Sequence, residues 1–329
     1  MARFRKKILL LLAGGTWLLD KNQRLLSIQE ASDIPAWLNS LPELSIMADL
    51  EPVFISSEED VLNAVIWEKM AKIILAKQAE VDGFIIVSRN EQLTYTASAL
   101  TFLLANFAKN IILTSSYLSG LEWQQDKEYL VKIKNKYSGL GLKANLINAI
   151  QALDYKLPQP AIMFGTRLLA AVRANFEPNS DLNLFSSLDN NYWGRVDFGV
   201  NVKTNLPSYK INLPNYNKLQ AEILILNNVS GLPWLFSKAE VKRYKAIIIK
   251  GETGSILEPD KLKQIKDWAR PIVLYNFTDY HPQANVFFIN NCTWSTALIK
   301  TMWLAANVKS NLEFGKLLNK NLIGEYLLY

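Results

Sequence analysis

Short apolar runs alternate with longer amphipathic stretches along most of the chain. In the stretch 94–108, Ala97, Leu100, Leu104 and Phe107 recur at spacings of three or four residues, which places them on one face of a helix. Parallel strands joined by crossover helices produce this alternation. The predicted strands in the first half lie at 7–12, 84–87, 110–114 and 160–164, and the predicted helices at 61–78, 94–108 and 143–153.

The region 177–218 differs because it is rich in Asn, Pro, Ser and Asp and has little helical periodicity. Such composition is typical of a connecting region with short antiparallel strands. The alternation then resumes, with strands predicted at 222–226, 246–249 and 271–275 and helices at 238–244, 259–270 and 295–307. We therefore predict an α/β protein with two domains. A larger, mostly parallel sheet domain spans 1–190, a connecting segment 191–214, and a smaller parallel α/β domain 215–329.

Composition and charge indicate which kinds of partner the protein can bind. The 329 residues are half hydrophobic, and 36 Lys and Arg against 30 Asp and Glu give a formal charge of +6. The positive residues are dispersed among acidic ones without a nucleic-acid-binding motif, so no specific nucleic-acid partner is expected. The apolar run 8–13 is too short for a secretory signal, and no segment approaches the about 18 apolar residues of a membrane helix. We predict a cytoplasmic protein without membrane association.

The chain has one cysteine, Cys292, and one histidine, His281. A zinc site built from Cys and His needs several such ligands, and a disulfide within one chain needs two thiols. A Ser-His-Asp or Cys-His arrangement would have to use His281, whose neighbours Tyr280 and Pro282 indicate an ordinary loop. No motif implies a metal or an organic cofactor, so none is predicted.

The sequence Ala13-Gly14-Gly15-Thr16 directly follows the first predicted strand. Glycines there let the chain turn sharply and bring backbone amides close to a ligand. A hydroxyl at the carboxyl end of a strand lies where open α/β sheets build their binding sites. Thr16 is therefore a candidate nucleophile, although Gly-Gly-Thr also occurs as a plain turn.

This segment is the first of six ordered blocks that resemble the cytoplasmic-type (type I) L-asparaginases. It resembles the Thr-Gly-Gly-Thr-Ile opening of that family, in which the last Thr is the nucleophile. The other blocks, which extend the resemblance over about residues 6–327, are Ser56-Ser57-Glu58, the two flanks 82–86 and 95–102 of the second active-site motif, 110–114, 145–149 and 321–325.

The resemblance implies an asparaginase-like two-domain fold and a homodimer or dimer of dimers with sites near subunit interfaces. It implies hydrolysis of a linear amide with Thr16 as the nucleophile. It also implies that the loop Ser56-Ser57-Glu58 holds the α-amino and carboxylate groups of a small amino-acid-like ligand.

The reactive groups depart from the family pattern inside these matching flanks. Where the family has His-Gly-Thr-Asp-Thr, the chain reads Ser88-Arg89-Asn90-Glu91-Gln92. Asn90 replaces a threonine hydroxyl with an amide, which cannot act as a nucleophile. Glu91 keeps the charge of the aspartate but moves the carboxylate by about 1 Å, and displacements of that size can cost about a hundredfold in rate. Arg89 adds bulk and positive charge in place of glycine, and we expect it beside the ligand.

The catalytic lysine of the family also lacks a counterpart. Ungapped counting from Thr166-Arg167-Leu168 places Phe176 at that position, and a shift of three residues would place Arg173 there. A phenyl ring can neither hold a carboxylate nor assist removal of a proton.

Three hypotheses follow from this combination. The chain is a degenerate homologue, a pseudoenzyme that keeps a pocket for an amino-acid-like ligand and hydrolyses little or no L-asparagine. Alternatively, it is a working amidohydrolase in which Thr16 attacks, Glu91 accepts the proton, and Arg89 or Arg173 replaces the lysine. A third possibility is a non-catalytic partner subunit of a hetero-oligomer.

Overall fold

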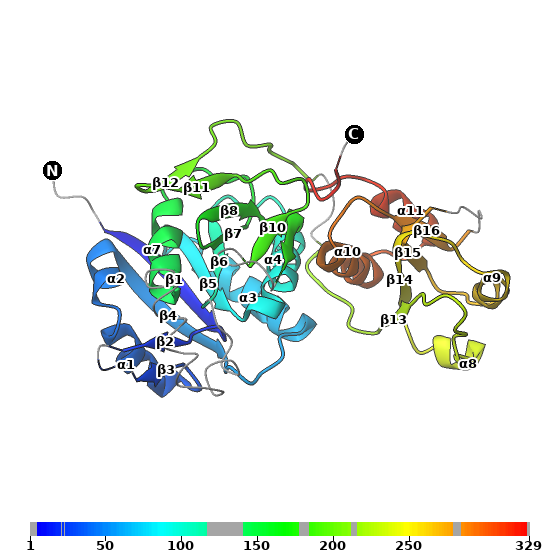
Figure 1. Ribbon diagram of the computed structural model, residues 1–329, viewed down its shortest axis with the longest axis horizontal. Coiled ribbons are helices and arrows are strands. Elements are labelled where there is room, and N and C mark those ends of the chain that lie inside the picture. Colours follow the sequence, from blue (N-terminus) through cyan, green and yellow to red (C-terminus); the bar gives the residue numbers. More distant parts are fainter. Residues whose placement is uncertain are drawn as a thin grey trace.

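A computed structural model of the chain describes residues 5–20, 22, 24–116, 141–177, 184–211, 216–278 and 284–327. These residues form a large eight-stranded sheet, a separate four-stranded parallel sheet, and helices that flank both (Figure 1). The predicted α/β class, with a larger, mostly parallel sheet followed by a smaller parallel one, is confirmed.

Five neighbouring strands of the large sheet run parallel, and the far end of the sheet is antiparallel. The strand order is β12-β11-β8-β7-β6-β5-β1-β4. The parallel strands are β4 (Ala48–Ser56), β1 (Lys6–Ala13), β5 (Gly83–Ser88), β6 (Ile111–Thr114) and β7 (Ala161–Phe164). The antiparallel strands are β8 (Arg167–Ala170), β11 (Gly194–Val196) and β12 (Val200–Val202). Two short antiparallel ladders lie outside this sheet, β2 (Leu18–Leu19) with β3 (Leu25–Leu26) and β9 (Ala174–Phe176) with β10 (Phe185–Ser187).

The first strand shows why its sequence is a continuous apolar run. Leu9 and Leu11 of β1 belong to one hydrophobic core with α3 (Ala64–Lys77) and α4 (Asn90–Leu103). Ile8 and Leu10 belong to a second core on the opposite face. Helices α1 (Ile34–Asn39), α2 (Pro42–Met47) and α7 (Leu142–Ala152) supply that second core. A strand covered on both faces needs apolar side chains at every position.

Strand β4 lies at the edge of the large sheet and was not predicted. Its sequence is interrupted by Glu51 and Pro52, which hide the strand pattern. Proline is tolerated at an edge because one side of the strand makes no ladder hydrogen bonds. The Glu51 carboxylate instead forms ion pairs with the amines of Lys7 (3.1 Å) and Lys77 (2.9 Å).

The smaller sheet is entirely parallel and follows chain order. Its strands are β13 (Ile223–Asn227), β14 (Ala246–Ser255), β15 (Ile272–Phe277) and β16 (Val286–Ile289), and its helices are α8 (Lys238–Val241), α9 (Pro259–Lys266), α10 (Trp294–Asn307) and α11 (Asn311–Leu318). Helices α8 and α9 share one core with the sheet, whereas α10 and α11 share the core that also contains α3 and α4. The two sheets are therefore joined through one continuous hydrophobic core.

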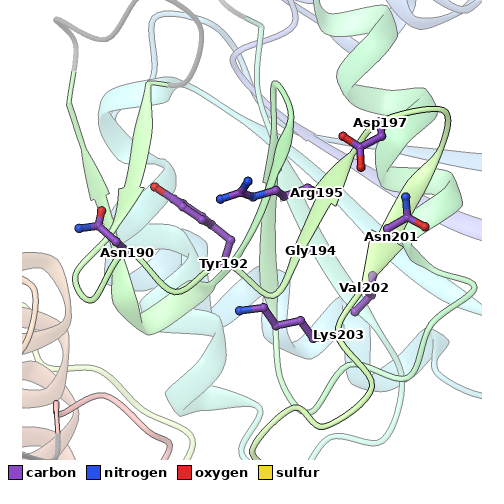
Figure 2. A pocket seen from close by; sticks show the side chains of 8 residues that line it. All are labelled: Asn190, Tyr192, Gly194, Arg195, Asp197, Asn201, Val202 and Lys203. Carbon is purple, nitrogen blue, oxygen red and sulfur yellow. The ribbon is translucent and has the colours of Figure 1, made fainter.

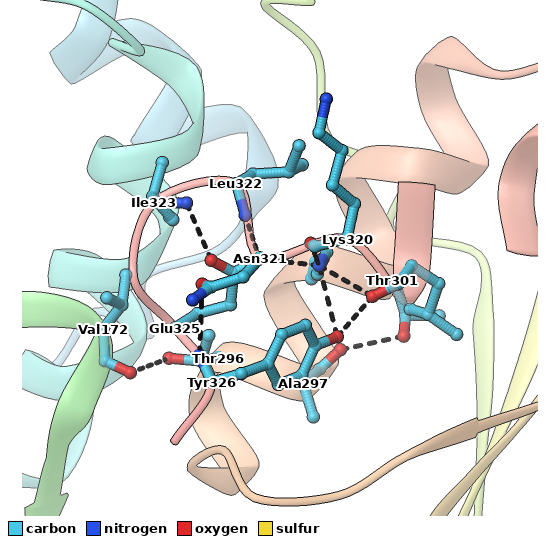
Figure 3. A network of polar contacts seen from close by, with 12 residues as sticks. Val172, Thr296, Ala297, Thr301, Lys320, Asn321, Leu322, Ile323, Glu325 and Tyr326 are labelled. Carbon is cyan, nitrogen blue, oxygen red and sulfur yellow. Dashed lines mark hydrogen bonds and ion pairs between the residues drawn. The ribbon is translucent and has the colours of Figure 1, made fainter. Parts of the chain in front are cut away.

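A buried ion pair secures the C-terminal segment beside this junction. The amine of Lys300 on α10 contacts the Glu325 carboxylate at 2.6 Å, and both side chains are fully buried. The same amine donates to the carbonyls of Leu318 and Lys320, both at 2.7 Å. Burial lowers the pKa of Lys300, and the Glu325 carboxylate opposes that effect. Figure 3 shows Glu325 and Tyr326 packed beside Thr296 and Thr301 of α10.

The segment predicted to connect the domains, 191–214, contributes β11 and β12 to the large sheet. The domain limits at 190 and 215 stay predictions. None of the helices in the described ranges is long and apolar enough to cross a membrane.

Candidate active site

The turn after β1 is shaped by two glycines. Gly14 and Gly15 have φ angles of +81° and +68°, a region that side chains other than glycine rarely adopt. A Cβ atom on Gly15 would lie 2.3 Å from the carbonyl oxygen of Ser88. The glycines therefore let the turn pass close to β5 and direct successive backbone N–H groups to one side, an arrangement that binds anions.

The anion at this turn is the side chain of Glu58. One carboxylate oxygen, Oε1, accepts hydrogen bonds from the Thr16 backbone N–H (2.7 Å) and the Thr16 hydroxyl (2.5 Å). The other oxygen, Oε2, accepts from the Gly15 N–H at 2.9 Å. The Thr16 hydroxyl also accepts the Ile28 N–H at 2.9 Å. Thr16 is fully buried and Glu58 is 5% exposed, so one internal carboxylate occupies the N–H groups of Gly15 and Thr16 and the Thr16 hydroxyl.

The residues of the predicted binding loop, Ser56-Ser57-Glu58, make different contacts. Ser56 ends β4 beside Ala13, and Glu58 reaches Thr16. Ser57 instead donates its N–H and its hydroxyl to the Asp60 carboxylate, at 2.7 and 3.0 Å. The structure thus brings Ser56 and Glu58 to the turn, while Ser57 makes a local loop contact.

Three serine hydroxyls lie at the carboxyl ends of the strands around the turn. Ser56 ends β4, Ser88 ends β5, and Ser115 follows β6. All three are buried, and their hydroxyl oxygens have no hydrogen-bond partner among the described residues. A Cβ atom on Gly15 would lie 2.7 Å from the Ser115 hydroxyl, which places that group directly against the turn. Buried hydroxyls of this kind provide polar groups for a ligand.

Arg89 connects the Glu58 loop to the start of α4. Its Nη1 donates to the Glu58 backbone carbonyl at 2.9 Å, and its Nε lies 2.9 Å from the Glu91 carboxylate. The Glu91 side chain is 46% exposed, so the carboxylate assigned to proton transfer lies at the surface. Asn90 is buried in the first turn of α4. The carboxylate that contacts the Thr16 hydroxyl is that of Glu58.

The two candidate positions for the missing lysine lie in other environments. Phe176 in β9 packs against Phe185, with ring centroids 5.5 Å apart. The Arg173 guanidinium contacts the Asp189 carboxylate at 2.6 Å and donates to the Gly324 carbonyl at 2.6 Å. Burial favours a higher pKa for Asp189, but hydrogen bonds from Ser187 and Asn191 and the Arg173 charge outweigh it and lower the pKa. Arg173 is thus engaged with Asp189 and the C-terminal segment.

The remaining candidate groups lie elsewhere. His281 is outside the described residues. Cys292 is 3% exposed, and burial raises the pKa of its thiol to about 12, which leaves it unreactive. In the part of the chain that the structure describes, no three His, Cys, Asp or Glu side chains are grouped to hold a metal ion.

Sequence reasoning missed the contact between Thr16 and Glu58, which are 42 residues apart. The glycine pair was the available signal, because consecutive N–H groups in such a turn favour an anion. It could not identify which carboxylate would reach them.

Comparison with known proteins fits this arrangement. Residues 7–130 match the family model described as Asparaginase, N-terminal. This part of the chain is similar to the asparaginase family. L-asparaginase 1 of Escherichia coli (strain K12) is 29% identical over 122 residues, which cover 37% of this chain and 32% of that protein. L-asparaginase of Dirofilaria immitis is 24% identical over 213 residues, covering 64% of this chain and 32% of that protein. The chain therefore spans about a third of the length of these asparaginases.

Solved asparaginase structures share the fold over nearly the whole chain. The thermostable L-asparaginase from Thermococcus kodakarensis superposes with a TM-score of 0.73 at 18% identity, covering 98% of this chain and 100% of that one. L-asparaginase I from Vibrio cholerae gives a TM-score of 0.73 at 21% identity, covering 99% and 100%. The asparaginase fold therefore extends beyond the region of detectable sequence similarity.

Proposed function

We propose that the protein is an asparaginase-family homologue that hydrolyses little or no L-asparagine and binds a small amino-acid-like ligand beside Thr16. The supporting observation is the Glu58 carboxylate, which accepts the Thr16 hydroxyl and the N–H groups of Gly15 and Thr16. Attack on an amide needs a free nucleophile and donors for the developing oxyanion. Glu58 must move before either is available.

The other departures from the family chemistry support the same proposal. Asn90 has no hydroxyl, Glu91 is paired with Arg89 at the surface, and Arg173 is engaged with Asp189. Loss of one positioned proton-transfer group costs about a hundred- to ten-thousandfold in rate. Turnover of L-asparagine is therefore expected at least about a hundredfold below that of an ordinary asparaginase.

The same donors define the class of ligand. A ligand carboxylate that displaces Glu58 can accept the three hydrogen bonds that Glu58 accepts now. The displaced Glu58 carboxylate can then pair with the ammonium group of that ligand, and the hydroxyls of Ser56, Ser88 and Ser115 add polar contacts. An amino acid with a short side chain meets these requirements.

Calorimetric titration with L-aspartate and with L-asparagine tests this proposal. Thr16→Val removes the hydroxyl at nearly constant volume, and Thr278→Val serves as the control because Thr278 is exposed. We expect saturable binding to the unmodified protein, about tenfold weaker binding to Thr16→Val because a charge-assisted hydrogen bond is lost, and no change in the control. Absence of binding of both L-aspartate and L-asparagine, or equal affinity in Thr16→Val, contradicts the proposal.

One observation favours a second candidate, an active amidohydrolase. The distance of 2.5 Å between the Thr16 hydroxyl and Glu58 Oε1 is suitable for proton removal by a general base. In this candidate Glu58 replaces Glu91 as the proton acceptor. Ammonia release from some amide would then be abolished by both Thr16→Ala and Glu58→Gln. A wide amide screen without ammonia release from the unmodified protein removes this candidate.

Assembly and location follow the family resemblance. We propose a cytoplasmic homodimer or dimer of dimers, because asparaginases are generally oligomeric. Light scattering on the eluting peak of a size-exclusion column measures the mass directly. A mass near 37.4 kDa, that of one chain, at micromolar concentration contradicts the oligomer.

A further inference from the structure

A cavity lined mainly by polar side chains, called the basin below, lies at the antiparallel end of the large sheet. It is far from Thr16 in the strand order. The cavity has a volume of about 410 Å³ and is lined by the β11–β12 hairpin and the residues on either side of it. Figure 2 shows the Arg195 and Lys203 side chains extending toward Tyr192, with Asp197 and Asn201 placed farther along the hairpin. The Thr16 site lies beside β1 and β4 at the other end of the strand order, so the basin is independent of the proposed function.

Two arginines oppose each other beside this basin: Arg195 lines it, and Arg167 lies on the neighbouring strand. Arg195 on β11 is the direct cross-strand partner of Arg167 on β8 in an antiparallel ladder. Like charges at directly opposed positions destabilise a ladder. The two guanidinium carbons lie 4.5 Å (Arg167) and 5.7 Å (Arg195) from the centroid of the Tyr192 ring, so one ring holds both cations. Neither guanidinium forms an ion pair with any residue in the described ranges.

The charges of the other residues that line the cavity do not offset the repulsion between Arg195 and Arg167. Lys203 brings a third cation, and its amine donates to the Asn191 side chain, which carries no charge. Asp197 is the sole carboxylate among the residues lining the cavity. The lining carries two cations and one carboxylate, and Arg167 on the same Tyr192 ring adds a third cation, so the net charge in and beside the basin is about +2. A dianion would neutralise it.

We propose that this basin binds a phosphate group, either inorganic phosphate or a small phosphate monoester. A phosphate monoester carries a charge of about −1.5 to −2 at neutral pH and presents three acceptor oxygens. Guanidinium groups bind such oxygens in a bidentate manner. Here Tyr192 positions the guanidinium of Arg195 in the cavity lining and that of Arg167 beside it. The volume of about 410 Å³ is within the range of small-molecule sites and leaves room for the organic part of a monoester.

Calorimetric titration at constant ionic strength tests the proposal with three probes: inorganic phosphate, glycerol 3-phosphate and succinate. We expect saturable binding of one or both phosphates. The tighter of the two identifies free phosphate or a monoester as the source. Absence of saturable binding by both phosphates, or tighter binding of succinate than of either, overturns the proposal.

Two variants assign the binding to the basin. Arg195→Gln and Lys203→Gln each remove one exposed cation, and Arg243→Gln is the matched control because Arg243 is an exposed arginine in the smaller domain. We expect Arg195→Gln to weaken phosphate binding about tenfold or more, Lys203→Gln to weaken it measurably, and the control to change it less than twofold. Unchanged affinity in Arg195→Gln overturns the assignment.

A denaturation measurement checks the repulsion argument separately. In phosphate-free buffer, Arg195→Gln should unfold at the same or a higher urea concentration than the unmodified protein, because it removes one of two opposed like charges. A lower midpoint means that the Arg195 cation is stabilising without a ligand, which contradicts the proposal.

Discussion

Glu58→Gln tests whether an internal carboxylate competes with ligands for the turn at Thr16. The substitution keeps the size of the side chain and removes its charge. Glu58 now uses both carboxylate oxygens, one toward Thr16 and the other toward the Gly15 N–H. An amide has one acceptor oxygen and one NH₂ group, so at least one of the three hydrogen bonds is lost.

The loss can be converted into a change of affinity. A hydrogen bond to a charged group contributes about 1.5–3 kcal/mol. Since about 1.4 kcal/mol corresponds to a tenfold change in an equilibrium constant, a ligand carboxylate should displace the amide side chain of the Glu58→Gln variant about 10- to 100-fold more readily than it displaces Glu58. The gain applies to any carboxylate that takes the same donors.

Titration with succinate and L-aspartate separates the two roles that Glu58 can have. If Glu58 competes with the ligand carboxylate and then pairs with the ligand ammonium group, succinate binds Glu58→Gln more tightly, and L-aspartate gains less than succinate because the variant cannot form that ion pair. If Glu58 holds the ligand ammonium group without competing for the donors at the turn, L-aspartate binds more weakly and succinate, which has no ammonium, is unaffected. The second pattern refutes the competition argument. Glu59→Gln is the matched control, because Glu59 is the adjacent, exposed glutamate and should leave both affinities unchanged.

Two further predictions concern stability. Lys300→Met leaves the buried Glu325 carboxylate without its cation and should lower the free energy of unfolding by about 3–5 kcal/mol. The double variant Lys300→Met with Glu325→Gln should lower that free energy by less, because no buried charge is left without a partner. Urea titrations in which the double variant is less stable than Lys300→Met contradict this prediction. Asp189→Asn removes the partner of Arg173 and should cost about 1–2 kcal/mol at pH 7. Because the folded pKa of Asp189 lies below the unfolded value of about 3.9, its contribution is complete above that pH and is lost as the pH falls through the folded pKa. The difference in the free energy of unfolding between Asp189→Asn and the unmodified protein should therefore shrink below about pH 4. The control is Asp267→Asn, because Asp267 is exposed. A difference for Asp189→Asn that stays constant with pH contradicts this prediction.

The fold was largely predictable because buried parallel strands leave a strong sequence signal. The runs at 7–12 and 84–87 became β1 and β5, whose side chains are buried on both faces of the sheet. Strand β4 escaped prediction because an edge strand tolerates Glu51 and Pro52, which interrupt the apolar run. The predicted helix at 94–108 begins earlier, at Asn90, since polar residues of its first turn do not reveal a helical period.

The chemistry of the site was less predictable. Gly14-Gly15-Thr16 indicated a turn with a hydroxyl, and the structure has that turn. The sequence did not indicate that Glu58 would contact that hydroxyl, because the contact joins two strand ends that are neighbours only in the folded sheet. Likewise, the engagement of Arg173 depends on Asp189 and the C-terminal segment, which no local pattern connects.

The rate of ammonia release from L-asparagine tests the central claim most directly. It should be measured at saturating substrate beside an ordinary asparaginase at equal subunit concentration. Because the Thr16 hydroxyl and both backbone donors are occupied by Glu58, the account predicts a rate at least about a hundredfold lower. A rate within about tenfold of the ordinary enzyme, and lost in Thr16→Ala, would contradict it.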